Sequence, residues 1–201
     1  LPGALAAEGA RMRVLMPAYR GLAERLSRKR ATEVETPFGA ARLLEGVAEG
    51  LDLILIESAL YDREGGPYLD EARRDWADNH LRFGLLCWMG AHVAARGLGG
   101  WRPDVVHAHD WQAGLTPTYL RMEGAGAAPC VITVHNIAFQ GLFGASTHVE
   151  LGLPAEFWSS DHVEFWGHVG FLKAGLLHAD AITTVSPSYA RELLTPRFGE
   201  G

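Results

Sequence analysis

The sequence has few cysteines, no long apolar run and no excess of positive charge. Its 201 residues include two cysteines, and 18 Lys and Arg residues against 24 Asp and Glu residues give a formal net charge of −6. Without a basic stripe to neutralise phosphates, the chain is not predicted to bind nucleic acid or an anionic membrane surface. Because no run of about 18 apolar residues occurs, no transmembrane helix is predicted.

The two cysteines and the first residues predict where the chain resides. Cys87 and Cys130 lie among apolar neighbours, which is typical of core thiols in a reducing compartment rather than of a disulfide or a metal site. No basic start followed by a long apolar stretch indicates a signal peptide. We therefore predict a cytoplasmic location. The sequence opens on Leu1 rather than Met, so we expect a truncated chain.

Hydrophobic spacing predicts strands that alternate with helices. Strands are expected at 13–19, 40–47, 51–56, 105–109, 130–135 and 181–185, with a turn at 50–52, and helices at 1–8, 75–96, 111–122, 165–178 and 187–194. Asp110 and Ser186 are predicted to cap the helices that follow them. This order predicts the α/β class, with a Rossmann-like, doubly wound and mainly parallel sheet. The first helix leads straight into a strand, as in a βαβ unit whose first strand is missing.

Polar residues end two of the predicted strands. One strand runs into His107-Ala-His109-Asp110-Trp111 and the other into His135-Asn136. In open α/β sheets, ligands bind outside the carboxyl ends of the strands. These side chains are therefore candidates for a binding site, although ordinary strand ends also carry capping and hydrogen-bonding groups.

Two chemistries suit these residues. His107, His109, Asp110 and His135 could supply metal ligands for a hydrolase, because His107 and His109 share one face of a strand. Alternatively, short polar side chains and aromatic faces suit a hydroxyl-rich ligand such as a sugar. Asp110-Trp111, His135-Asn136 and a Gly- and Pro-rich loop with Tyr61 and Tyr68 supply that mixture. We favour the sugar.

Long motifs carry a family resemblance. They are RVLMPAY (13–19), LYDREGGPYLD (60–70), DNHLRFGLLCW (78–88), WRPDVVHAHDWQAGLTPTYL (101–120), VITVHNIAFQGLF (131–143) and FLKAGLLHADAITTVSPSYARE (171–192). The sequence resembles bacterial glycogen synthases and plant starch synthases, which are glycosyltransferases with two Rossmann-like domains (the GT-B architecture). The segment 21–59 is less distinctive.

The resemblance implies transfer of glucose, with retention, from ADP-glucose or UDP-glucose to the non-reducing end of an α-1,4-glucan. His135 and Asp110 would be the catalytic-site residues: His135 would contact the 6-hydroxyl of the transferred glucose, and Asp110 would bind sugar hydroxyls. Trp111, Asn136 and Tyr68 would form the acceptor side, with His107 and His109 as supports. No cofactor or metal is implied, since the nucleotide sugar is a substrate.

The resemblance also implies a domain organisation. Residues 1–201 match the N-terminal, acceptor-side domain, beginning after the first strand and the Lys-x-Gly-Gly loop of the family and lacking the C-terminal nucleotide-binding domain. Lys173-Ala-Gly175 lies in a predicted helix and is no substitute for that loop. The chain alone is therefore expected to be inactive. A metal-dependent hydrolase and a non-catalytic carbohydrate-binding module are the alternatives.

Overall fold

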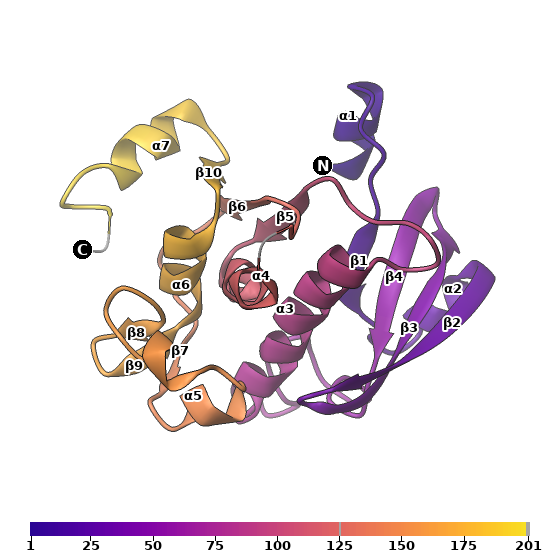
Figure 1. Ribbon diagram of the computed structural model, residues 1–201, viewed down its shortest axis with the longest axis horizontal. Helices are drawn as coiled ribbons and strands as arrows, with labels where there is room; N and C mark the ends of the chain where they lie inside the picture. Colours follow the sequence, from indigo (N-terminus) through magenta and orange to yellow (C-terminus); the bar gives the residue numbers. More distant parts are fainter. Residues whose placement is uncertain (125, 200–201) are drawn as a thin grey trace. The chain divides into compact units, whose positions relative to one another are not determined.

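The computed structural model describes residues 1–124 and 126–199, which form two compact units, Leu1–Arg82 and Phe83–Gly201 (Figure 1). Unit 1 contains α1 (Pro2–Ala7), β1 (Val14–Pro17), α2 (Leu22–Arg25), β2 (Ser27–Thr36), β3 (Gly39–Ala48) and β4 (Leu51–Glu57). The helix α3 (Asn79–Arg96) begins in unit 1 and continues into unit 2. Unit 2 then contains β5 (Val106–His109), η1 (Trp111–Ala113), α4 (Thr116–Glu123), β6 (Cys130–Val134), β7 (Leu142–Gly144), α5 (Thr147–Glu150), η2 (Ala155–Phe157), β8 (Glu164–Phe165), β9 (His168–Gly170), α6 (Phe171–His178), β10 (Ala181–Thr184) and α7 (Pro187–Leu193).

Unit 1 is built on a four-stranded sheet in the order β1-β4-β3-β2. β1 pairs with β4 in parallel, whereas β4, β3 and β2 form an antiparallel meander. A buried apolar cluster is formed by Leu44 of β3, by Leu53 and Leu55 of β4, and by Leu26, which lies between α2 and β2. The strand β2 was not anticipated: its ten residues are exposed except for two half-buried positions, so it carries little hydrophobic signal.

The turn between β3 and β4 lies at Glu49–Gly50 rather than at the predicted 50–52. Both residues have positive φ, 51° at Glu49 and 78° at Gly50, as a two-residue hairpin turn requires. Leu51 and Asp52 are already paired with β3. Glycine is therefore the second turn residue, and the prediction placed the turn too late.

Unit 2 contains a three-stranded parallel sheet in the order β10-β6-β5 (Figure 1). The central strand is buried, with Ile132 and Val134 almost without exposure. Helix α6 packs closely on this layer because Gly114 and Gly175 lack side chains: a Cβ at Gly114 would lie 2.3 Å from the Phe171 carbonyl oxygen. The parallel sheet with its flanking helices confirms the predicted α/β class.

Two predicted helices begin later than expected, and a third is divided into two. Residues 75–78 precede the helix α3, which starts at Asn79. The predicted helix 111–122 is divided into η1 and α4, because Gly114 and Leu115 separate the two. The predicted helix 165–178 is helical only from Phe171, because Trp166 and Gly167 have positive φ and form the turn of the β8–β9 hairpin. The predicted helix 187–194 is confirmed as α7, with Ser186 Oγ accepting a hydrogen bond from the Tyr189 amide at 3.1 Å.

Both cysteines are free and buried, as predicted. Burial raises the pKa of the Cys87 thiol and of the Cys130 thiol to about 12. Protonated thiols of this kind are poor nucleophiles, so both behave as small core residues. Across residues 1–124 and 126–199, no helix is long and apolar enough to cross a membrane.

Candidate functional site at the carboxyl ends of two strands

The parallel pairing of β5 and β6 brings the two predicted motif ends to one edge of the unit 2 sheet. His109 lies opposite Thr133, and the Asp110 amide extends the pairing by donating to the Thr133 carbonyl oxygen at 2.9 Å. Both strands then end, so residues 109–111 and 135–136 follow at the same edge. The structure thus brings together four of the five predicted site residues: Asp110, Trp111, His135 and Asn136.

Asp110 joins the two strand ends through its side chain. Its Oδ1 accepts hydrogen bonds from the backbone amides of His135 at 2.7 Å and Asn136 at 3.3 Å. The prediction that Asp110 caps the following helix is wrong, because no side-chain cap bond to η1 is formed. The carboxylate binds the neighbouring strand end instead.

The Asp110 backbone is strained. Its φ of 52° and ψ of −167° fall in a region that essentially only glycine adopts without cost. Such a conformation costs on the order of 1–3 kcal/mol and persists only where the surroundings hold it in place. The two amide hydrogen bonds to Oδ1 provide that restraint, and strain of this kind is concentrated at functional sites.

Three imidazoles lie beside Asp110. His109 Nδ1 contacts His135 Nε2 at 3.0 Å, and the His107 ring stacks on the His109 ring with a centroid distance of 4.3 Å. His107 Nε2 contacts Thr133 Oγ1 at 2.6 Å, which in turn contacts Thr183 Oγ1 at 2.7 Å. A polar ladder therefore crosses β5, β6 and β10 and supports the His109–His135 pair. The expected role of His107 and His109 as supports of the site stays a prediction.

The neutral imidazole is favoured at His109 and His107. Burial, followed by the nearby His107 and His135, lowers the pKa of His109 to about 4. The pKa of His107 is also lowered, mainly by burial and then by His135. Near neutral pH His109 therefore carries one proton, so it either donates to His135 or accepts from it.

Trp111 is packed in an aromatic cluster. Its ring contacts Phe83 edge-on at a centroid distance of 4.7 Å and lies 5.9 Å from Phe143 and 6.3 Å from Phe171. Gly141 covers the indole: a Cβ there would lie 2.5 Å from Trp111 Cε3, and the φ of Gly141 is +64°. Glycine is required at this point, which explains Gly141 in the VITVHNIAFQGLF motif.

Asn136 begins a tight loop at the edge of the site. Its Oδ1 accepts from the Ala138 amide at 3.1 Å, and Gln140 Nε2 donates to the Ile137 carbonyl oxygen at 2.6 Å. The Tyr189 hydroxyl, on α7, accepts from the Ile137 amide at 3.0 Å. Tyr189 was not predicted to support this loop, since nothing in its sequence context places α7 beside residues 135–140.

Tyr68 belongs to unit 1, whereas the other four predicted site residues belong to unit 2. It is 44% exposed. Its loop is held by side chains from the DNHLR motif: Asn79 Nδ2 donates to the Tyr68 carbonyl oxygen at 3.0 Å, and Arg82 Nη1 donates to the Pro67 carbonyl oxygen at 2.8 Å. The two motifs at 60–70 and 78–88 therefore form one local structure.

The metal-site alternative finds no support in the geometry. Within residues 1–124 and 126–199, no group of three or more His, Cys, Asp or Glu side chains could hold a metal ion. His109 and His135 contact each other, and Asp110 Oδ1 is bound to two amides. Lys173 lies in α6 and donates to the carbonyl oxygens of Ser160, His162 and Glu164, which is a structural role.

Together these features describe an α/β protein with a polar site at the carboxyl edge of a parallel sheet. The profile of the starch synthase catalytic domain family matches residues 1–201, the whole chain, and the chain belongs to this family.

Known proteins support this assignment. The chain is 53% identical over 205 residues to a glycogen synthase of Roseobacter denitrificans and 49% identical over 205 residues to glycogen synthase 1 of Rhizobium meliloti. In both cases the match covers 100% of the chain and 43% of the relative, so the chain spans less than half the length of these curated relatives. The fold is similar to that of the catalytic domain of starch synthase IV from Arabidopsis thaliana, solved with ADP and acarbose. That match has a TM-score of 0.81 and 26% identity, and it covers 98% of the chain and 42% of the solved chain. The predicted fold family is thereby confirmed.

Proposed function

We propose that residues 1–201 form the acceptor-side, N-terminal domain of a glycogen or starch synthase. The supporting observation is that the family matches the whole chain. Within the matched region, the His135 amide of the VHN motif donates a hydrogen bond to Asp110 of the HAHDW motif. The enzyme would use ADP-glucose or UDP-glucose as donor and an α-1,4-glucan as acceptor. A nucleotide-sugar donor agrees with the ADP in the solved starch synthase. A cytoplasmic location remains a prediction.

In the proposed reaction, the bond between C1 of glucose and the leaving phosphate oxygen breaks while the acceptor 4-hydroxyl oxygen bonds to C1 on the same face. The hydroxyl proton passes to the leaving diphosphate, so no protein nucleophile is needed. Positive charge develops on the sugar ring in the transition state. Preorganised dipoles that point at this charge stabilise the transition state, and this is usually the largest contribution to the rate enhancement.

The geometry suggests how each residue would act. With Oδ1 of Asp110 bound to two amides, Oδ2 is the oxygen that would accept from a sugar hydroxyl. Similarly, Nε2 of His135 contacts His109, so Nδ1 would meet the 6-hydroxyl of the transferred glucose. Trp111, Asn136 and Tyr68 are proposed to line the acceptor side. The His135 backbone, tied to Asp110, would then stay in a fixed position during transfer.

The test is steady-state kinetics on the full-length protein with ADP-glucose, UDP-glucose and a maltooligosaccharide acceptor. We expect transfer, and we expect His135→Ala to lower kcat by about 10²–10³-fold with a smaller change in the donor KM, because a positioned group acts mainly on the transition state. Circular dichroism would establish that the variant is folded. A folded His135→Ala variant with a near-normal kcat would overturn the assignment of His135.

The two alternatives predict other results. A metal-dependent hydrolase would carry stoichiometric zinc or manganese and lose activity on chelation. A non-catalytic carbohydrate-binding module would bind glucan without any transfer by the full-length protein. The 201-residue chain by itself is expected to transfer no glucose, since it spans 43% of the length of its relatives.

A further inference from the structure

The backbone loop that follows β6 is held by two different elements. Asp110, at the end of β5, accepts hydrogen bonds from the first two amides of the loop, those of His135 and Asn136. The third amide, that of Ile137, donates to the Tyr189 hydroxyl at 3.0 Å. Tyr189 lies on α7, which follows β10 in the chain. Successive amides of the loop are therefore bound from the β5 end and from α7.

The peptide unit between Asn136 and Ile137 is bound at both of its polar groups. The Asn136 carbonyl oxygen accepts from the Phe139 amide at 3.3 Å, and the Ile137 N–H donates to Tyr189. A peptide unit is planar and carries one donor and one acceptor, so two bonds of this kind fix its orientation. Without the Tyr189 hydroxyl, only the longer bond from Phe139 would remain.

The side chain of Asn136 depends on the same part of the loop. Its Oδ1 accepts from the Ala138 amide at 3.1 Å, so Nδ2 is the group that would donate to a hydroxyl of the acceptor sugar. The Ala138 amide lies one residue beyond Ile137. A rotation of the peptide unit at Ile137 would therefore move the Ala138 amide and, with it, the Asn136 side chain.

The start of α7 places Tyr189 precisely enough for this contact. Ser186 Oγ accepts from the Tyr189 amide at 3.1 Å, and Pro187 in the first turn restricts the backbone there. The preceding strand, β10, is bound to β6 at its end, because Thr184 lies opposite Val134 and its Oγ1 donates to the Val134 carbonyl oxygen at 2.7 Å. Strand pairing and a helix cap thus bring the hydroxyl to the loop.

We propose that Tyr189 is a positioning residue for glucose transfer. In this role it contacts neither sugar: its hydroxyl holds the peptide unit at Ile137 and, through it, the side chain of Asn136 and the backbone that follows His135. The inference rests on the proposed function for the roles of Asn136 and His135. A misplacement of about 1 Å at a site of this kind can lower a rate by about 10²-fold, so loss of one hydroxyl should be seen in kcat.

The experiment compares the full-length protein with Tyr189→Phe, which removes the hydroxyl and keeps the ring. Amide hydrogen exchange at Ile137, followed by mass spectrometry of the peptide that contains it, should be about tenfold faster in the variant, because the amide has lost its acceptor. With a maltooligosaccharide acceptor, kcat should fall about tenfold, while the KM of the nucleotide-glucose donor should change by less than about twofold, since the hydroxyl acts on geometry in the transition state.

Tyr119→Phe is the matched control. The Tyr119 hydroxyl donates to the Leu151 carbonyl oxygen at 2.7 Å, and the side chain is buried on α4 in unit 2. This variant also loses one hydroxyl that binds the backbone, so it should be destabilised at least as much as Tyr189→Phe. It should nevertheless keep the wild-type kcat and the wild-type exchange at Ile137. The pair therefore separates positioning from a general loss of stability.

A wild-type kcat in folded Tyr189→Phe would overturn the inference and leave the proposed function intact. Unchanged exchange at Ile137, or an equal loss of kcat in Tyr119→Phe, would overturn it as well. Absence of glucose transfer by the wild type would instead overturn the proposed function. In that case the role of Tyr189 in transfer would fall with it, and exchange at Ile137 would still show whether Tyr189 holds the loop.

Discussion

Oδ1 of Asp110 accepts a hydrogen bond from the backbone amide of His135 at 2.7 Å, and this contact helps to join the ends of β5 and β6. Asp110 adopts a glycine-like backbone conformation to make it. The position of the His135 main chain therefore depends on a side chain 25 residues earlier in the sequence. Two motifs that are separate in the chain act as one structural group.

Replacing Asp110 should separate its two roles. In the full-length protein, Asp110→Asn keeps an oxygen that can accept from the His135 amide, so the variant should fold normally but lose a charged acceptor for sugar hydroxyls. Asp110→Ala loses both, and it should lower kcat by about 10² or more and also destabilise the protein by about 1–3 kcal/mol. Kinetics and thermal unfolding of both variants check this. Equal unfolding temperatures for the two would contradict the restraining role.

His109 should determine which nitrogen of His135 carries the proton. ¹⁵N NMR of the imidazole nitrogens should show a single tautomer of His135 in the wild type, a similar population in His109→Asn, whose side-chain amide can replace Nδ1, and a mixture in His109→Phe. The pKa of His109 near 4 implies that kcat does not change through protonation of His109 between pH 6 and pH 8. A His135 tautomer ratio unchanged in His109→Phe would refute this role.

Gly141 should not tolerate even a methyl group. Gly141→Ala places a Cβ 2.5 Å from the Trp111 ring at a φ of +64°, so we expect a loss of about 1–3 kcal/mol in unfolding free energy. Gly144→Ala is the control, since a Cβ at Gly144 would meet nothing within 4 Å. Denaturant unfolding of the two variants measures the difference. Similar stabilities would mean that the Trp111 cluster can shift to accommodate the methyl group.

Acid should destabilise the protein through His178. This side chain is 4% exposed, its Nδ1 contacts Thr118 Oγ1 at 2.8 Å, and its Nε2 contacts His162 Nδ1 at 2.9 Å. Burial, then Arg121, His162 and Lys173, lower its pKa to about 4 from an ordinary value near 6.5. The unfolded chain therefore binds more protons between these two values, so this contribution to stability is complete above pH 6.5 and is lost as the pH falls towards 4.

Melting temperatures measured from pH 7.5 to pH 4.5 test this expectation. The decrease over that range should be smaller in His178→Gln, which does not titrate but can still form hydrogen bonds to both neighbours. The variant should be somewhat less stable than the wild type at pH 7.5. Parallel curves for the two proteins would show that other groups cause the acid sensitivity.

Local patterns in the sequence determined the α/β class and most of its strands. Apolar runs such as 130–135 and helical spacing in 75–96 are properties of short segments, so they can be recognised without the fold. The polar residues at strand ends could also be identified, because parallel sheets place such ends at one edge. Ser186-Pro187 predicted the start of α7 for the same reason: a cap is a local structure.

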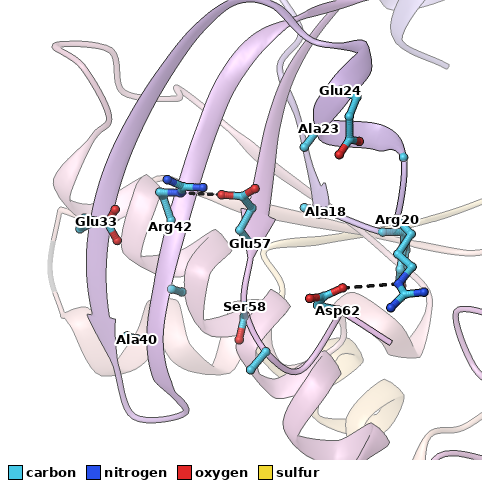
Figure 2. Close-up of a pocket in the computed structure, with 14 residues that line it drawn as sticks. Ala18, Arg20, Ala23, Glu24, Glu33, Ala40, Arg42, Glu57, Ser58 and Asp62 are labelled. Atoms are coloured by element: carbon cyan, nitrogen blue, oxygen red, sulfur yellow. Dashed lines mark hydrogen bonds and ion pairs between the residues drawn. The ribbon is translucent and has the colours of Figure 1, made fainter. Parts of the chain in front are cut away.

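Only the tertiary structure decided how these residues are used. Asp110 looks like a helix cap in sequence, but the parallel register of β5 and β6 brings the His135 amide within reach of its carboxylate. The exposed strand β2 and the β8–β9 hairpin have weak hydrophobic patterns, and they form because neighbouring strands and the Trp166–Gly167 turn pair them. A cavity in unit 1 is lined by residues from 18 to 62, and only strand pairing brings them to one place (Figure 2).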